Sequence, residues 1–213
     1  MISRTIQKKL KSIASAIVLS IGMSGMALAA VEWNAGMTSE YMWRGMSQGK
    51  GAAVSGGIDI SGDSGFSAGT WVSNIDFGDE ATYELDLYAG YSMGPISLGY
   101  IYYAYPDGEE LDFSEVSISA DIGAFSIGAN ILADADWGAD FGDDVYYTLD
   151  TSFNAAEGID ISLHLGFYDY DASDEETDYG ISIDFESGFS FAVIDSSRDD
   201  SDPYFVITYA IGG

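Results

Sequence analysis

Acidic side chains recur at every second position in several segments of this 213-residue chain. Because successive side chains of a β-strand point to opposite faces, residues spaced by two share one face of a sheet. Carboxylates gathered on one solvated face attract cations and repel anions. The residues that we expect on this face are Glu32, Glu40, Glu84, Asp86, Glu115, Asp121, Asp150, Asp160, Asp184 and Glu186.

One basic residue, Arg44, has the same spacing as the carboxylates of the first segment. A lone buried charge is costly, so we expect Arg44 to pair with neighbouring carboxylates such as Glu40 or Glu84. Two roles are open for such a pair. It would hold a constriction or a plug in a water-filled interior, or it would be a purely structural ion pair in a sealed one.

The sequence shows no constellation for nucleophilic catalysis. His164 is the one histidine, and a catalytic histidine needs a nucleophile beside it and a third group that orients it. We therefore expect His164 to be a polar residue on the acid-bearing face. We predict no enzyme activity, no cofactor and no bound metal.

The segment from Tyr83 to Ser92 shows most clearly which element positions the carboxylates. Its sequence, YELDLYAGYS, alternates strictly between two faces, as expected for a strand that is apolar on one side and polar on the other. The apolar face carries Tyr83, Leu85, Leu87, Ala89 and Tyr91, and the polar face carries Glu84, Asp86, Tyr88, Gly90 and Ser92. A strand with lipid on one side and water on the other has this pattern.

Aromatic residues mark both ends of several apolar faces, which is typical of the girdles of membrane barrels. Besides Tyr83 and Tyr91, the pattern places Trp33 and Trp43 at the two ends of the first strand. Trp71 is an exception, because it shares the spacing of small polar neighbours rather than of apolar ones.

Alternating segments of roughly ten residues repeat to the end of the chain. Their connections alternate between tight turns and longer acidic loops, an ordering that a soluble β-sandwich does not require. We therefore predict an all-β fold, a transmembrane antiparallel up-and-down β-barrel of about 12 strands, with about 10 as the alternative. The expected strands cover residues 31–44, 52–61, 66–76, 82–92, 96–105, 113–122, 125–132, 145–153, 159–168, 178–186, 189–195 and 204–211.

The first 29 residues have the features of a secretory signal peptide. A basic region contains Arg4, Lys8, Lys9 and Lys11, an apolar stretch follows, and Ala27-Leu28-Ala29 supplies a cleavage site. We predict its removal, which leaves residues 30–213 as the barrel domain. With 4 of the 7 basic residues removed, 3 remain against 35 acidic ones, a formal net charge of −32. This charge excludes nucleic-acid binding, and the absence of cysteine excludes disulfides and a lipoprotein anchor.

The stretch from Ser39 to Gln48 reads S-E-Y-M-W-R-G-M-S-Q. It resembles the S-x-Y-x-x-R-G-x-S-Q opening of the TorF family of porins, also called Gcw_chp. Further similar blocks are residues 65–77, 83–91, 99–106, 164–169 and 177–180. The resemblance covers essentially the whole mature chain, implies a bacterial outer-membrane β-barrel, and implies no catalytic residues.

Together, these patterns predict a monomeric, porin-like channel in the outer membrane that passes small solutes and prefers cations through an acidic lumen. The residues that we expect to set the selectivity are Arg44, Glu40, Glu84, Asp86, Glu115, Asp121, Asp150 and Asp184. The expected partners are outer-membrane lipid and small solutes or cations. One alternative is a barrel with a closed lumen whose acidic external loops bind surface partners or divalent cations; an outer-membrane enzyme and a secreted soluble sandwich are weaker alternatives.

Overall fold

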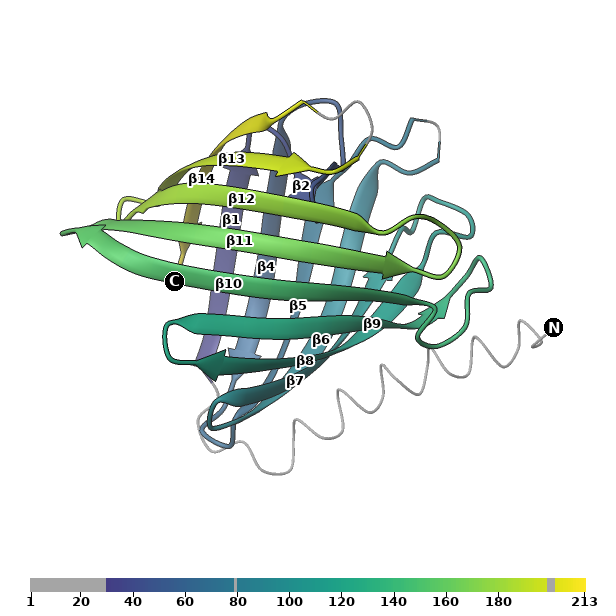
Figure 1. Ribbon diagram of the computed structural model, residues 1–213, viewed down its shortest axis with the longest axis horizontal. Coiled ribbons are helices and arrows are strands. Elements are labelled where there is room, and N and C mark those ends of the chain that lie inside the picture. The colour runs from purple at the N-terminus through teal and green to yellow at the C-terminus, as the bar shows by residue number, and fades with distance from the viewer. Residues whose placement is uncertain (1–29, 79, 199–201) are drawn as a thin grey trace.

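Twelve strands form a closed antiparallel barrel in the computed structural model, which describes residues 30–78, 80–198 and 202–213 (Figure 1). Closure is complete because β1 pairs with both β4 and β14, with Ala35 opposite Gly56 on one side and Ile211 on the other. The barrel strands are β1 (Ala30–Thr38), β4 (Ala53–Ser61), β5 (Phe66–Asn74), β6 (Tyr83–Met93), β7 (Ile96–Ala104), β8 (Phe113–Ile122), β9 (Phe125–Ala135), β10 (Asp144–Ala156), β11 (Ile159–Tyr170), β12 (Glu176–Phe185), β13 (Phe189–Ser196) and β14 (Tyr204–Gly212). The predicted all-β antiparallel barrel is confirmed, and so is the prediction of 12 strands over the alternative of 10.

The two faces of the barrel wall follow the period-two pattern of the sequence. Leu87 and Ile118 on the outer face are 44% and 48% exposed, whereas Glu84 and Glu115 on the inner face are each 2% exposed. Trp71, the exception to the pattern, is half-buried and packs edge-on against Tyr41, with 5.4 Å between the ring centroids. Trp71 therefore faces inward, because the interior offers it an aromatic partner.

Short turns close one end of the barrel and long loops the other, as the sequence predicts. Two residues, Gly123 and Ala124, separate β8 from β9, and Gly123 adopts the positive φ of 66° that such a tight connection requires. At the opposite end, residues 136–143 join β9 to β10 and residues 105–112 join β7 to β8. No helix in the described part of the chain is long and apolar enough to cross a membrane. The predicted signal peptide, residues 1–29, lies outside the described residues.

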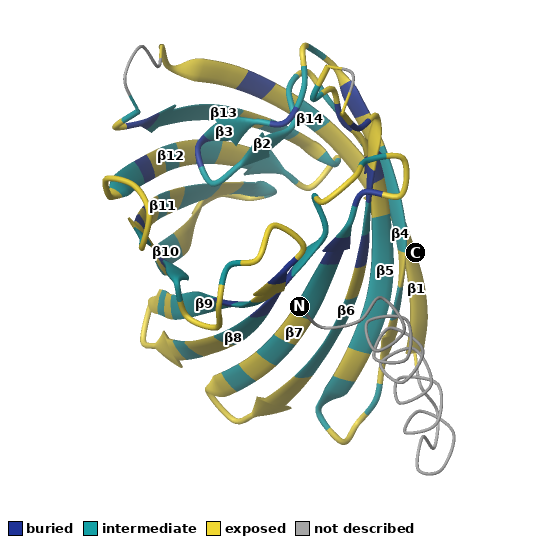
Figure 2. Cartoon of the chain, turned by 90° about the vertical axis from the view of Figure 1, so that its right-hand side faces the viewer, coloured by how far each residue is buried: buried dark blue, intermediate teal, exposed yellow. Residues whose placement is uncertain are grey.

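The first predicted strand, 31–44, is wrong at its C-terminal end. β1 ends at Thr38, and the chain then forms a separate hairpin of β2 (Met42–Trp43) and β3 (Met46–Ser47). Arg44 and Gly45 form its two-residue turn with φ values of 50° and 74°, the backbone of a type I′ hairpin turn. Arg44 is therefore not a strand residue, and Trp43 does not bracket β1. Figure 2 shows this lumenal hairpin, residues 42–47, inside the ring of barrel strands.

Candidate functional site

The lumenal hairpin is held by contacts with strands on several sides of the barrel. The Trp43 ring lies about edge-on to Tyr103 of β7, Phe113 of β8 and Tyr168 of β11, at centroid distances of 6.1, 6.0 and 6.3 Å. Gly45 lies so close to β12 that an added Cβ would be 2.6 Å from the Cβ of Asp178. The hairpin therefore crosses the interior and docks on the far wall.

Arg44 at the tip of the hairpin forms a buried ion pair with Glu115 of β8. Its Nη1 and Nη2 atoms donate to Oε1 and Oε2 of Glu115 at 2.7 and 2.6 Å, and Nη1 also donates to the hydroxyl of Tyr168 at 3.0 Å. The guanidinium lies 4.3 Å from the ring centroids of both Trp43 and Tyr146. The two side chains are 7% and 3% exposed, so bidentate hydrogen bonding and the aromatic faces replace the lost water.

This geometry corrects the expected partner of Arg44. Neither Glu40 nor Glu84 pairs with it, because the hairpin carries the guanidinium away from β1 toward β8. Glu40 instead accepts a hydrogen bond from the hydroxyl of Ser47 within the same segment. Pairing itself was expected from the cost of a buried charge, and it is confirmed.

Glu84 of β6 anchors the segment that enters the hairpin. Tyr41 donates to its Oε1 at 2.8 Å and Tyr105 donates to its Oε2 at 2.9 Å. Asp86, two residues further along the same face, is also buried, and its Oδ1 has no hydrogen-bond partner among the described residues. Neither carboxylate pairs with a cationic side chain of the described chain. This side of the interior therefore holds two buried carboxyl groups without a cationic partner among the described residues.

On the exit side, the segment is tied to the loop after β5. Lys50 donates to Asp76 at 3.1 Å, and the backbone N–H of Asp76 donates to the carbonyl of Gln48 at 3.0 Å. The backbone N–H of Gly78 and the ammonium of Lys50 lower the pKa of the Asp76 carboxyl. This ion pair is well exposed, unlike the pair at the hairpin tip.

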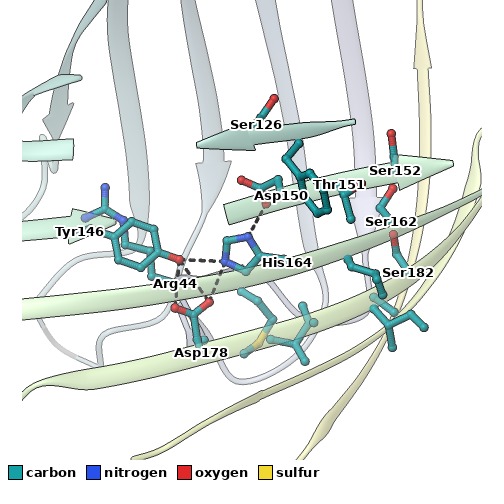
Figure 3. Close-up of a pocket in the computed structure, with 18 of the residues that line it drawn as sticks. Arg44, Ser126, Tyr146, Asp150, Thr151, Ser152, Ser162, His164, Asp178 and Ser182 are labelled. Atoms are coloured by element: carbon teal, nitrogen blue, oxygen red, sulfur yellow. Dashed lines mark hydrogen bonds and ion pairs between the residues drawn. The ribbon is translucent and has the colours of Figure 1, made fainter. Parts of the chain in front are cut away.

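A cavity of about 950 Å³, here called the inner cavity, lies between the hairpin and the short-turn end of the barrel. Its lining includes Arg44, Asp121, Asp150 and Asp178, together with hydroxyl side chains at Ser126, Thr151, Ser152, Ser162 and Ser182. Figure 3 shows Arg44 and Asp178 together with Ser126, Asp150, Thr151, Ser152, Ser162 and Ser182 around this cavity. The inner cavity is therefore polar, and its lining carries three carboxylates against the basic side chains of Arg44 and His164.

His164 lies in the wall of the inner cavity between two carboxylates (Figure 3). Its Nδ1 is 2.6 Å from Oδ1 of Asp150, and its Nε2 is 3.0 Å from Oδ1 of Asp178 and 2.9 Å from the hydroxyl of Tyr146. Both ring nitrogens are thus engaged by groups other than serine. This arrangement does not supply the serine–histidine contact that nucleophilic catalysis requires.

Further toward the short turns, serine hydroxyls surround Asp184. Ser162, Ser182 and Ser190 donate to its carboxylate at 3.1, 2.7 and 2.6 Å. Asp160 lies directly opposite Asp184 in the β11–β12 register, so two inward carboxylates are neighbours. Among the residues that the structure describes, no three His, Asp or Glu side chains converge as a metal site.

A second cavity of about 830 Å³, here called the outer cavity, lies on the long-loop side of the hairpin. Trp43 and Gly45 line both cavities, so the hairpin separates them. The aromatic residues in the lining of the outer cavity are Trp43, Phe77, Tyr105, Phe113, Trp137, Tyr168, Tyr170 and Tyr204. Its charged residues are Asp144, Glu176 and Arg198.

The residues predicted from the sequence therefore differ in position. Arg44, Asp121 and Asp150 line the inner cavity, whereas Glu40 and Asp184 line neither cavity. Glu84 and Glu115 are buried in the wall and bind the hairpin segment through Tyr41 and Arg44, and Asp86 is buried beside Glu84. The sequence reasoning missed Asp178, which it grouped with an acidic loop. The signal was available, because Asp178 shares the inward spacing of Gly180, Ser182 and Asp184.

Comparisons with known proteins agree with this architecture. The family model described as "Bacterial protein of unknown function (Gcw_chp)" matches residues 23–208. A comparison with curated protein sequences finds no match.

Among solved structures, the fold is similar to that of the KdgM porin, with a TM-score of 0.53 and 9% identity over 87% of this chain and 98% of that one. A structure from work on the in-meso crystallization of membrane proteins gives a TM-score of 0.52 and 8% identity, over 85% of this chain and 83% of that one. The KdgM porin in complex with disordered oligogalacturonate gives 0.48 and 11%, over 87% and 96%. At these identities, the two matches with TM-scores above 0.5 show similarity of the barrel fold alone.

Proposed function

The chain belongs to the Gcw_chp family of bacterial proteins, and we propose that it forms an outer-membrane channel through which small solutes diffuse passively, with a preference for cations. The observation that carries this proposal is the pair of cavities, about 950 and 830 Å³, enclosed by a barrel whose outer face is apolar. Passive diffusion needs no catalytic chemistry.

The outer surface supports a membrane location. Water-exposed apolar side chains in this number would be unfavourable in a soluble protein but are required where strands face acyl chains. Exposed outward residues of this kind are Val54, Ile58, Leu87, Leu98, Ile118, Ile127, Leu149, Leu163, Ile181, Phe191 and Ile207.

Exposed aromatic residues form two bands on this outer surface. Tyr83, Tyr147 and Tyr179 lie toward the long-loop ends of their strands, whereas Trp33, Tyr91 and Phe153 lie toward the short-turn ends. Aromatic girdles at the two headgroup levels have this arrangement. In that orientation the short turns face the periplasm and the long loops face the exterior.

The lumenal hairpin would be the constriction of the channel. A barrel of about 12 strands is narrow compared with the larger porins, and a hairpin docked across its interior narrows it further. Solutes would pass the hairpin where Trp43 and Gly45 border both cavities. The wall carboxylates would concentrate cations there, because charges act strongly between low-dielectric walls.

The hairpin also favours a second candidate function. If it remains docked at all times, the lumen is sealed, and the barrel is a structural or surface-binding protein. The buried Arg44–Glu115 ion pair, which fastens the hairpin to the wall, supports this reading. In that case the acidic external loops would carry the function.

Conductance of the refolded protein in planar bilayers distinguishes the two functions. We expect single-channel current steps. In a KCl gradient, we expect the reversal potential to have the sign of a channel that passes K⁺ more readily than Cl⁻. A bilayer that contains folded protein but shows no steps would support the sealed barrel. A reversal potential of the opposite sign would contradict the cation preference.

A further inference from the structure

We propose that the outer cavity is a binding site for small organic cations that carry an apolar or aromatic body. That such a cation is a solute of the channel rests on the proposed function. That it binds in the outer cavity rests on the residues of the cavity alone. Three features support it: a chain of aromatic rings, an excess of negative charge, and the way in which the protein accommodates its own Arg44.

The rings of the outer cavity form a continuous series of contacts. Trp137 lies 5.7 Å from Phe113, which lies 6.0 Å from Trp43, and Trp43 lies 6.3 Å from Tyr168. Tyr168 then stacks on Tyr170 at 4.0 Å and an interplanar angle of 7°. Aromatic faces carry negative electrostatic potential and offer large apolar area, so they suit a cation with an apolar body.

The charged groups around the cavity leave negative charge in excess. Arg198 pairs with Glu176 and also donates to the hydroxyl of Tyr170 at 3.0 Å, so these two charges offset each other. Asp144 accepts a hydrogen bond of 3.4 Å from the backbone N–H of Asp171 and pairs with no cationic side chain of the described chain. Asp144 therefore presents a carboxylate to an aromatic cavity.

The protein already contains a cation in such surroundings on the other side of the hairpin. The guanidinium of Arg44 lies over the rings of Trp43 and Tyr146 and is bound by the carboxylate of Glu115. The outer cavity presents the same components, namely aromatic faces and a carboxylate at Asp144. Among the described residues that line it, the one cationic side chain is Arg198, which pairs with Glu176. An external cation in the outer cavity would therefore have surroundings similar to those of the Arg44 guanidinium on the other side of the hairpin.

Tryptophan fluorescence of the refolded protein tests the inference, because Trp43 and Trp137 both line the cavity. The probes are benzyltrimethylammonium, benzyl alcohol as a neutral aromatic compound, and benzenesulfonate as an anionic one. We expect saturable quenching by benzyltrimethylammonium alone. Quenching by all three probes with similar affinity, or by none, would overturn the proposal.

Two variants and two controls locate the site. Asp144→Asn preserves the acceptor for the Asp171 N–H and should weaken binding by about fivefold, and Trp137→Ala, at a residue 52% exposed, should do the same. The controls are Asp140→Asn, which removes a loop charge outside the cavity, and Trp33→Phe on the outer face, and both should bind as the wild type does. Equal binding by Asp144→Asn and Asp140→Asn would refute the assignment.

Conductance measured on the same preparation separates this inference from the proposed function. Binding of the cation by a protein that does not conduct would uphold the site and refute the channel. Conduction without specific quenching would refute the site and leave the channel standing.

Discussion

The two Nη atoms of Arg44 meet the two carboxylate oxygens of Glu115 at 2.7 and 2.6 Å, although 71 residues separate them in the chain. The pair joins the tip of the lumenal hairpin to the inner face of β8. Because the hairpin contributes no strand to the barrel wall, this contact can be broken without opening the barrel.

Loss of one partner of this pair should release the hairpin. Glu115→Gln or Arg44→Met leaves the other charge buried and uncompensated, which costs about 3–5 kcal/mol for a pair of this kind. We expect a larger single-channel conductance and faster trypsin cleavage in residues 39–52, while circular dichroism still reports an intact barrel.

The exposed ion pair at the other end of the same segment provides a matched control. Lys50→Met breaks the Lys50–Asp76 pair, in which the lysine side chain is 70% exposed, and surface pairs contribute about 0–1 kcal/mol. Its conductance should equal that of the wild type. If Lys50→Met and Arg44→Met behave alike, the tip contact does not fasten the hairpin.

Gly45→Ala should undock the hairpin for steric reasons. Its φ of 74° costs an alanine roughly 1–2 kcal/mol, and the new Cβ would in addition lie 2.6 Å from the Cβ of Asp178 and 3.0 Å from that of Ser196. Mass spectrometry should detect cleavage after Arg44 on brief exposure to trypsin.

Gly78→Ala distinguishes the effect of backbone strain from that of a steric clash with β12. Gly78 has a similar φ of 76°, but an added Cβ there would have nothing within 4 Å. This variant should keep Arg44 protected from trypsin. Cleavage after Arg44 in both variants would mean that close contact with β12 is unimportant for docking.

Carboxylates that line the inner cavity should set most of the cation preference. Asp121→Asn and Asp150→Asn remove charge at the cavity surface, so the reversal potential in a KCl gradient should move toward zero in each. Glu84→Gln and Asp86→Asn should have smaller effects, because both carboxylates are buried and neither lines a cavity.

Asp63→Asn, in the turn between β4 and β5, controls for the general loss of one negative charge. The same shift in this variant and in Asp150→Asn would attribute selectivity to the overall charge of the protein. In that event the lumenal assignment fails.

The barrel wall could be predicted from the sequence because side-chain direction in a strand depends only on position. In residues 83–92 the alternation alone identifies Glu84 as inward and Leu87 as outward, and the structure confirms both. The ordering of short and long connections likewise follows from local turn residues such as Gly123.

The interior could not be predicted in this way. The alternation of the first segment continues past Thr38, so nothing in its period indicates that the chain leaves the wall. Arg44-Gly45 is a weaker turn signal than Asn-Gly, and its conformation is maintained by contacts with Glu115 and Asp178 that are distant in sequence. Trp71 is the one sequence signal for this interior segment. A large aromatic residue at an inward position needs a packing partner inside the barrel, and that partner is Tyr41.

The central claim is that the outer faces of the barrel contact lipid while the inner faces enclose water, and adjacent residues on β8 test it most directly. Because the chain has no cysteine, Ile118→Cys and Ser119→Cys can each carry a single fluorescent label in reconstituted protein. The structure predicts that brominated lipid quenches the label at 118 and spares 119, whereas the neutral aqueous quencher acrylamide quenches 119 and spares 118. The reverse pattern, or acrylamide quenching of both labels, would contradict the account.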